Sequence, residues 1–140
     1  MEHRYTILVA LNEPVNVLLY KKLLEKRGYD VLTAESGEES LQIMQVIVPD
    51  LVLLDLLIPG KDGFKVLAEI KRNPLIQAVP VIIVTELDNN SSKERAFHLG
   101  ASAYITIPVS AKTILDRIDA LLNSIKLQDI PIPPGNNQSR

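Results

Sequence analysis

Residues 49–64 read PDLVLLDLLIPGKDGF, with four consecutive apolar residues, an aspartate and two glycine-containing turns. The apolar run at 51–54 does not alternate with polar residues, which is typical of a strand buried on both faces of a parallel sheet. Asp55 follows at the point where such a strand leaves the core. The dipeptides at 59–60 and 62–63 are Pro-Gly and Asp-Gly, which favour turns. The stretch therefore predicts a buried strand followed by a loop that carries an acidic residue.

The rest of the chain repeats a strand-then-helix pattern around this stretch. Further apolar runs predict strands at 7–11 and 79–84, and weaker candidates lie at 31–34 and 103–107. Amphipathic patterns predict helices at 14–27, 36–48, 62–73, 91–99 and 110–125. Buried strands that alternate with helices predict an α/β fold, with a parallel sheet and helices on both faces.

Local signals mark the ends of several predicted helices. Ser36 with Glu39 three residues later has the spacing of a capping box at the start of the helix at 36–48. We expect Leu41, Met44 and Val48 to form the apolar face of that helix.

Composition limits the classes of function. The chain has 140 residues and is 46% hydrophobic, which suits one globular domain, expected at 1–126. Its net charge of −2 argues against nucleic-acid and membrane-surface binding, and the absence of cysteine excludes disulfides and thiolate zinc sites. No apolar stretch approaches the length of a transmembrane helix, so a cytoplasmic protein is expected. Residues 127–140 are rich in proline and asparagine and predict a flexible tail or the start of a linker.

Candidate functional residues follow the predicted strands. Ligands and chemistry collect at the carboxyl ends of the strands in open α/β sheets. The residues at those ends are Leu11, Asn12, Glu13, Asp55, Thr85, Glu86, Ile107 and Pro108. Taken alone, Asp55 could face water, cap a turn, or act as a nucleophile toward phosphorus.

Together these segments resemble the receiver domains of two-component response regulators. The similarity is carried by residues 49–64, 81–85 and 100–108, and by 7–9 with the Glu13-Pro14 turn; in all it spans residues 5–124. It implies a flavodoxin-like (βα)5 three-layer sandwich with a five-stranded parallel sheet in the order 2-1-3-4-5. It also implies a phosphoryl switch and a cis peptide bond before Pro108.

The resemblance assigns roles to three residues. Asp55 matches the phosphoacceptor, Thr85 matches the hydroxyl that binds the phosphoryl group, and Tyr104 matches the aromatic switch residue. In the family, an acidic pair after the first strand helps hold Mg²⁺, and a lysine after the fifth strand contacts the phosphoryl oxygens.

Four positions depart from the family pattern. Leu11 and Asn12 replace the acidic pair, Ile107 replaces the lysine, and Glu86 adds bulk and charge where the family has a small residue. Losing one preorganised donor from such a site commonly costs about 3 kcal/mol, so we expect phosphotransfer to be suppressed. Any Mg²⁺ binding, through Asn12, Asp55 and the Leu57 backbone, should be weak.

We weigh three classes of function. The first is a protein-binding signalling module impaired in phosphorylation, whose partners are a sensor histidine kinase or a downstream effector and whose binding surface covers residues 89–122. The second is an active phosphoacceptor; in that case Leu57 and Leu87 should exclude water and slow the loss of phosphate. The third is an enzyme on the same fold, and we do not expect one. A haloacid-dehalogenase-type phosphatase would need an aspartate where Leu57 stands, and a flavodoxin would need a hydroxyl-rich loop after the first strand.

Overall fold

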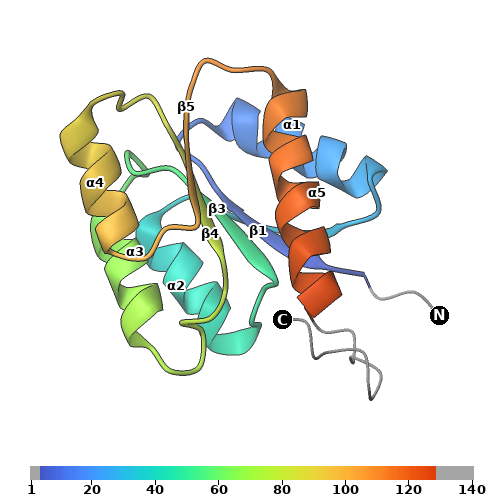
Figure 1. The fold of residues 1–140 in the computed structure, drawn as a ribbon, viewed down its shortest axis with the longest axis horizontal. Coiled ribbons are helices and arrows are strands. Elements are labelled where there is room, and N and C mark those ends of the chain that lie inside the picture. Colours follow the sequence, from blue (N-terminus) through green and yellow to red (C-terminus); the bar gives the residue numbers. More distant parts are fainter. Residues whose placement is uncertain (1–3, 129–140) are drawn as a thin grey trace, which may run out of the picture. The chain divides into compact units, whose positions relative to one another are not determined.

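Five strands form one parallel sheet in the computed structural model, which describes residues 4–128 (Figure 1). The strands are β1 (Thr6–Ala10), β2 (Asp30–Ala34), β3 (Leu51–Leu54), β4 (Val81–Thr85) and β5 (Ala103–Thr106). Their order is β2-β1-β3-β4-β5 and every neighbouring pair is parallel. This topology is flavodoxin-like, and the predicted sheet order is confirmed.

The helices are α1 (Pro14–Lys26), α2 (Gly37–Val46), α3 (Gly63–Arg72), α4 (Asn90–His98) and α5 (Ala111–Gln128). The chain divides into two compact units, one ending at Val109 and the other beginning at Ser110. The first unit holds the whole sheet with α1 to α4, and the second holds α5. Along α5, the apolar residues Ile114, Ile118 and Leu122 recur every four residues. This helix runs three residues past its predicted end, and the rest of the predicted tail lies outside the described residues.

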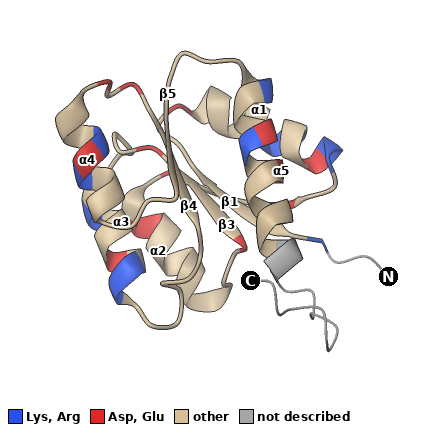
Figure 2. Cartoon of the chain, viewed as in Figure 1, with Lys and Arg blue, Asp and Glu red and all other residues tan. Residues whose placement is uncertain are grey.

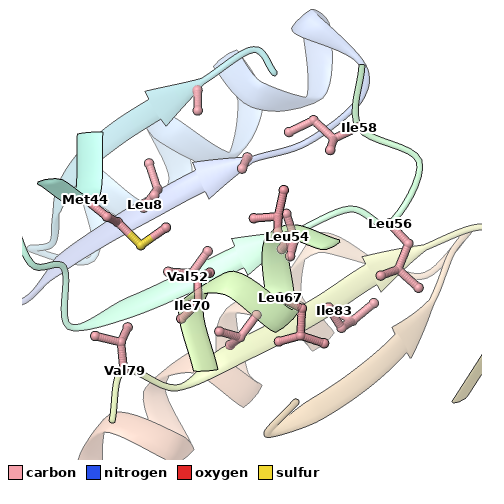
Figure 3. Packing of buried hydrophobic residues seen from close by; sticks show 14 of the residues in the cluster. Leu8, Met44, Val52, Leu54, Leu56, Ile58, Leu67, Ile70, Val79 and Ile83 are labelled. Carbon is pink, nitrogen blue, oxygen red and sulfur yellow. The ribbon is translucent and has the colours of Figure 1, made fainter. Parts of the chain in front are cut away.

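Within the first unit, helices cover both faces of the sheet. Side chains from α2, α3 and α4 pack in one cluster with the residues of β1, β3 and β4 that point to the same face (Figure 3). Leu8, Val52, Leu54 and Ile83 are fully buried members of this cluster. Helix α1 lies on the other side of the sheet, with Val17, Tyr20 and Leu24 buried (Figure 1). The continuous apolar runs of the sequence reflect strands that are covered on both faces.

The start of α2 follows the predicted capping pattern only in part. The Ser36 Oγ accepts a hydrogen bond from the Glu39 backbone N–H at 3.1 Å. The Glu39 carboxylate accepts one at 2.6 Å, but from the N–H of Glu35 rather than from that of Ser36. Both bonds still engage backbone donors at the helix start, which no intrahelical carbonyl can reach.

The end of α2 corrects the prediction for Val48. The helix stops at Val46, and Ile47 is already extended with φ −129° and ψ 127°. Pro49 disfavours helical backbone at the residue before it, so the helix cannot continue through Val48. Val48 is therefore 55% exposed and is not part of the apolar face of the helix.

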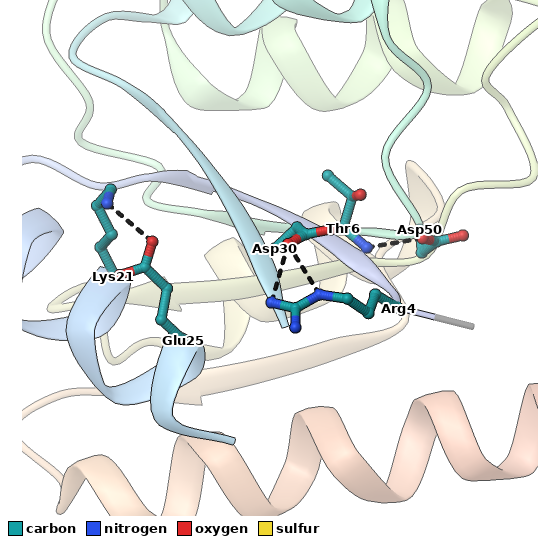
Figure 4. Close-up of polar contacts among 6 residues, drawn as sticks. All are labelled: Arg4, Thr6, Lys21, Glu25, Asp30 and Asp50. Carbon is teal, nitrogen blue, oxygen red and sulfur yellow. Dashed lines mark hydrogen bonds and ion pairs between the residues drawn. The ribbon is translucent and has the colours of Figure 1, made fainter. Parts of the chain in front are cut away.

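Polar contacts fix the amino-terminal edge of the sheet (Figure 4). Asp50 accepts a hydrogen bond from the Thr6 N–H at 2.7 Å through its side chain and donates its own N–H to the Thr6 carbonyl at 2.8 Å. Arg4 pairs with Asp30 at 3.0 Å at the start of β2. These contacts help set the register that brings the opposite ends of the strands together.

Candidate functional site at the carboxyl ends of the strands

Asp55 leaves the sheet directly after the fully buried strand β3. Its backbone N–H donates to the Ala10 carbonyl at 2.9 Å, which extends the pairing of β1 with β3 by one residue. Only 6% of the residue is exposed. The loop that follows returns closely over the strand end, because a Cβ atom at Gly63 would lie 2.4 Å from the Leu56 Cα and 2.8 Å from the Asp55 carbonyl oxygen. Glycine at 63 thus allows the loop to hold Asp55 in place.

Burial governs the electrostatics of Asp55. Desolvation raises the pKa of its carboxyl group above the ordinary value. Hydrogen bonds from the Leu57 backbone, the Thr85 side chain and the Asn12 backbone act in the opposite direction, and the charge of Glu86 raises the pKa again. The Leu57 N–H lies 2.9 Å from Oδ1. Neutral hydrogen-bond donors therefore stabilise the Asp55 carboxylate, and its charged neighbour is a second carboxylate, that of Glu86.

Thr85 and Tyr104, the predicted phosphoryl-binding and switch residues, both interact with Asp55, and their roles stay predictions. Thr85 ends β4, is fully buried, and its hydroxyl hydrogen-bonds with the Asp55 carboxylate. The Tyr104 hydroxyl donates to the Leu87 carbonyl at 2.7 Å, and its ring lies 6.4 Å from that of Phe97. Burial raises the pKa of Tyr104, and the charges of Asp88 and Asp55 raise it further. The loop before α4, which is acidic in Figure 2, therefore contacts Tyr104 through the Leu87 carbonyl and places the charge of Asp88 near the Tyr104 hydroxyl.

A cavity of about 460 Å³ collects the remaining candidates around Asp55. The four positions that depart from the family pattern all line it, namely Leu11, Asn12, Glu86 and Ile107. The peptide bond between Ile107 and Pro108 is cis, as expected. Leu57, by contrast, contributes its backbone to Asp55 and is 44% exposed. The structure therefore brings Leu11, Asn12, Asp55, Glu86 and Ile107 together around one cavity, whereas Thr85, Tyr104 and Leu57 are not among its lining residues.

Several cavity residues were missed by the sequence reasoning. Asn16 and Tyr20 of α1, together with Val84 and Val109, also line the cavity. A signal for the α1 pair exists in the sequence: the helix begins close to the carboxyl end of the first strand, and residues four apart share one side of a helix. Asn16 and Tyr20 have that spacing.

The donor set at Asp55 does not fit a resident Mg²⁺. Among residues 4–128, no three His, Cys, Asp or Glu side chains are grouped so as to hold a metal ion. The cavity offers the carboxylates of Asp55 and Glu86, the amides of Asn12 and Asn16 and, beside them, the backbone of Leu57. Mg²⁺ needs near-octahedral oxygen coordination and usually binds through carboxylates. Weak binding therefore stays a prediction, and no chemical step is assigned to the metal.

Known proteins share this sequence pattern. The family model of the response regulator receiver domain matches residues 7–119. The chain is 35% identical over 116 residues to Protein PilH of Pseudomonas aeruginosa, which covers 83% of this chain and 96% of PilH. It is 36% identical over 116 residues to the alkaline phosphatase synthesis transcriptional regulatory protein PhoP of Bacillus subtilis, covering 83% of this chain and 48% of PhoP.

Solved structures share the fold. The signal receiver domain of a signal transduction histidine kinase from Syntrophus aciditrophicus aligns with a TM-score of 0.81 and 27% identity, covering 94% of this chain and 98% of that one.

None of the helices within residues 4–128 is long and apolar enough to cross a membrane. The chain belongs to the response regulator receiver domain family and is a receiver domain of two-component signalling.

Proposed function

We propose that this receiver domain is impaired in phosphorylation and acts by binding protein partners, namely a sensor histidine kinase or a downstream effector. The observation that carries the proposal is the cavity wall around Asp55. Leu11, Glu86 and Ile107 stand there, and none of the described residues that line the cavity is basic. A phosphoryl group carries about −1.5 to −2 charge at neutral pH, so it would meet Glu86 without a compensating cation.

The surface near Tyr104 supports protein binding. Phe97 on α4 is 50% exposed and lies beside the Tyr104 ring. Exposed aromatic side chains are enriched at protein interfaces, where they supply large contact areas. The helices carry both signs of charge (Figure 2), which suits protein partners better than nucleic acid.

The alternative is an active phosphoacceptor, and one contact favours it. The Thr85 hydroxyl already hydrogen-bonds with the Asp55 carboxylate, and Asp55 lines a cavity large enough for a phosphodonor. Structural neighbours include a receiver described as the phosphorylated response regulator RcpA, at 26% identity and a TM-score of 0.74. The two functions differ in whether Asp55 becomes phosphorylated, so one phosphorylation assay distinguishes them.

The test is phosphorylation by acetyl phosphate with Mg²⁺, followed by intact-protein mass spectrometry. We expect no labelling of the wild type and clear labelling of the Asn12→Asp, Ile107→Lys double variant, in which a ligand and a cation are restored. Asp55→Asn in the double variant is the control and should abolish the label. Wild-type labelling at the rate of the double variant would establish the alternative instead.

If the double variant also stays unlabelled, Glu86 becomes the next position to change. Adding Glu86→Ala should then restore labelling, because it removes the bulk and charge beside the acceptor. Titration with beryllofluoride, an acyl-phosphate mimic, gives an independent readout by NMR. Asp55-dependent shifts that extend to Thr85 and Tyr104 would show that the domain still responds to a phosphoryl-like group at Asp55.

A further inference from the structure

We propose that the cavity around Asp55 binds a small organic cation with an apolar body, such as an arylalkylammonium ion. The volume of the cavity, about 460 Å³, lies within the range of roughly 300–1,000 Å³ that is typical of small-molecule sites. Such sites combine mostly apolar walls with a few polar groups that orient the ligand. The described residues of the cavity have this composition.

The walls suit an apolar ligand body. Six of the ten described lining residues have apolar or aromatic side chains: Leu11, Tyr20, Val84, Ile107, Pro108 and Val109. Leu11, Tyr20 and Val84 are 4%, 7% and 2% exposed, so these wall residues are packed in the core. Apolar atoms placed against them leave water, which favours binding by roughly 25 cal/mol for each Å² buried. A hydrated metal ion or a phosphoryl group has no apolar surface to bury against these walls, so it would gain no hydrophobic free energy from them.

The charges in the cavity select a cation. Its two ionisable acids are Asp55 and Glu86, its neutral polar side chains include Asn12 and Asn16, and no described lining residue is positively charged. Asp55 is almost fully buried and is held by neutral donors only. An ammonium group between the two carboxylates would supply the opposite charge that the cavity lacks, whereas an anion would be repelled by both.

A bare divalent metal ion fits less well than an ammonium group. Residues 4–128 contain no group of three acidic, histidine or cysteine side chains placed for a metal. An ammonium ion needs only hydrogen-bond acceptors, and the carboxylates and amide oxygens of the cavity provide them. The inference rests on the proposed function, because both depend on a cavity around Asp55 whose described lining holds carboxylates and no basic side chain.

The experiment titrates the full chain with three ligands that share an indole body. Tryptamine carries an ammonium group, tryptophol a hydroxyl group and indole-3-propionate a carboxylate. Binding is measured by NMR shifts of the Asn12, Asn16 and Leu57 amides and by calorimetry. For ligands of this size we expect tryptamine to bind with a Kd on the order of a millimolar or below, with tryptophol weaker and indole-3-propionate silent.

Variants locate the binding. Asp55→Asn and Glu86→Gln should each weaken tryptamine by roughly tenfold, as expected for the loss of a charge-assisted hydrogen bond. Ile107→Lys should abolish binding, because its ammonium group would occupy the place of the ligand. Glu94→Gln is the matched control: it removes the same charge from a carboxylate on α4 that does not line the cavity, and it should leave the Kd unchanged.

Three outcomes would overturn the inference. These are no binding of tryptamine, equal binding of all three ligands, and tryptamine binding that is insensitive to both Asp55→Asn and Glu86→Gln. Acetyl phosphate labelling of the same preparation separates this failure from that of the proposed function. A labelled wild type that also binds tryptamine would refute only the impairment, whereas an unlabelled wild type that binds nothing would refute only the cation site.

Discussion

At the scale of single residues, Asp55 is stabilised and destabilised by different neighbours. Its carboxylate accepts hydrogen bonds from Leu57, Thr85 and Asn12, yet it is buried beside the charge of Glu86. Burial without a cation costs free energy when the group is ionised. The ionised form of Asp55 should therefore lower the stability of the folded protein, and this can be measured.

Asp55→Asn should stabilise the protein at neutral pH. Folding raises the pKa of Asp55, so the stability that its protonated form contributes is present at low pH and is lost as the pH rises through the raised pKa. The variant cannot ionise at this position, so its advantage over wild type should grow from about pH 4 until the pH passes the raised pKa, and stay constant above it. Urea unfolding of both proteins across this range checks the prediction. A variant that is less stable at neutral pH would mean that the hydrogen bonds to the carboxylate outweigh its burial.

Much of this residue-level picture could be predicted from the sequence. Leu11, Asn12, Asp55, Glu86 and Ile107 were expected to meet because parallel strands place their carboxyl ends at one edge, and all five line one cavity. Asn16 and Tyr20 were missed, although α1 begins next to the carboxyl end of β1, because a helical pattern shows which residues are apolar but not which side of the helix faces the cavity. The rotamers that decide contacts such as that of Tyr104 with Leu87 are likewise absent from the sequence pattern.

At the scale of elements, the types were predicted better than the ends. Each predicted strand and helix is present, but β4 begins at Val81 rather than at 79 and α2 stops at Val46 rather than at 48. These two differences involve proline: Pro80 has no N–H to donate and pairs only through its carbonyl, which accepts from the Val52 N–H at 3.0 Å, and Pro49 limits the residue before it. The sequence pattern does not distinguish the apolar residues before a proline from those after it. Only the residues after Pro80 belong to the strand, and the residues just before Pro49 lie outside the helix.

The junction between β3 and α3 depends on the absence of a side chain at Gly63. Gly63→Ala should destabilise the protein by about 3 kcal/mol, because its Cβ would meet the backbone of Leu56 and Asp55. Gly28→Ala is a useful comparison. Its φ is 93° and nothing lies within 4 Å of its added Cβ, so it should cost only about 1 kcal/mol of backbone strain.

The two glycine variants are measured by urea unfolding and by the NMR shift of the Leu57 amide. Gly63→Ala should move the Leu57 signal, because the loop that presents Asp55 must shift, and Gly28→Ala should leave it in place. Equal losses of stability with an unmoved Leu57 signal would show that the loop accommodates a methyl group.

At the scale of the whole molecule, the sheet was predictable because its strands are continuous apolar runs. What composition could not show is which apolar residues lie in the core and which lie on the surface. Leu54 is fully buried, whereas Val46 is 83% exposed. Their difference arises from topology, since β3 lies at the centre of the sheet and Val46 lies at the last turn of a helix.

This contrast gives a prediction for overall stability. Leu54→Ala should lower the free energy of unfolding by about 2–5 kcal/mol, because Leu54 packs in the core cluster with side chains from α2, α3 and α4 and its removal leaves a cavity. Val46→Ala removes apolar atoms from an exposed site and should change stability by no more than about 0.5 kcal/mol. Urea unfolding of both variants provides the measurement. Similar losses for the two would mean that Val46 is covered in solution, and the oligomeric state of the protein would then be the next quantity to determine.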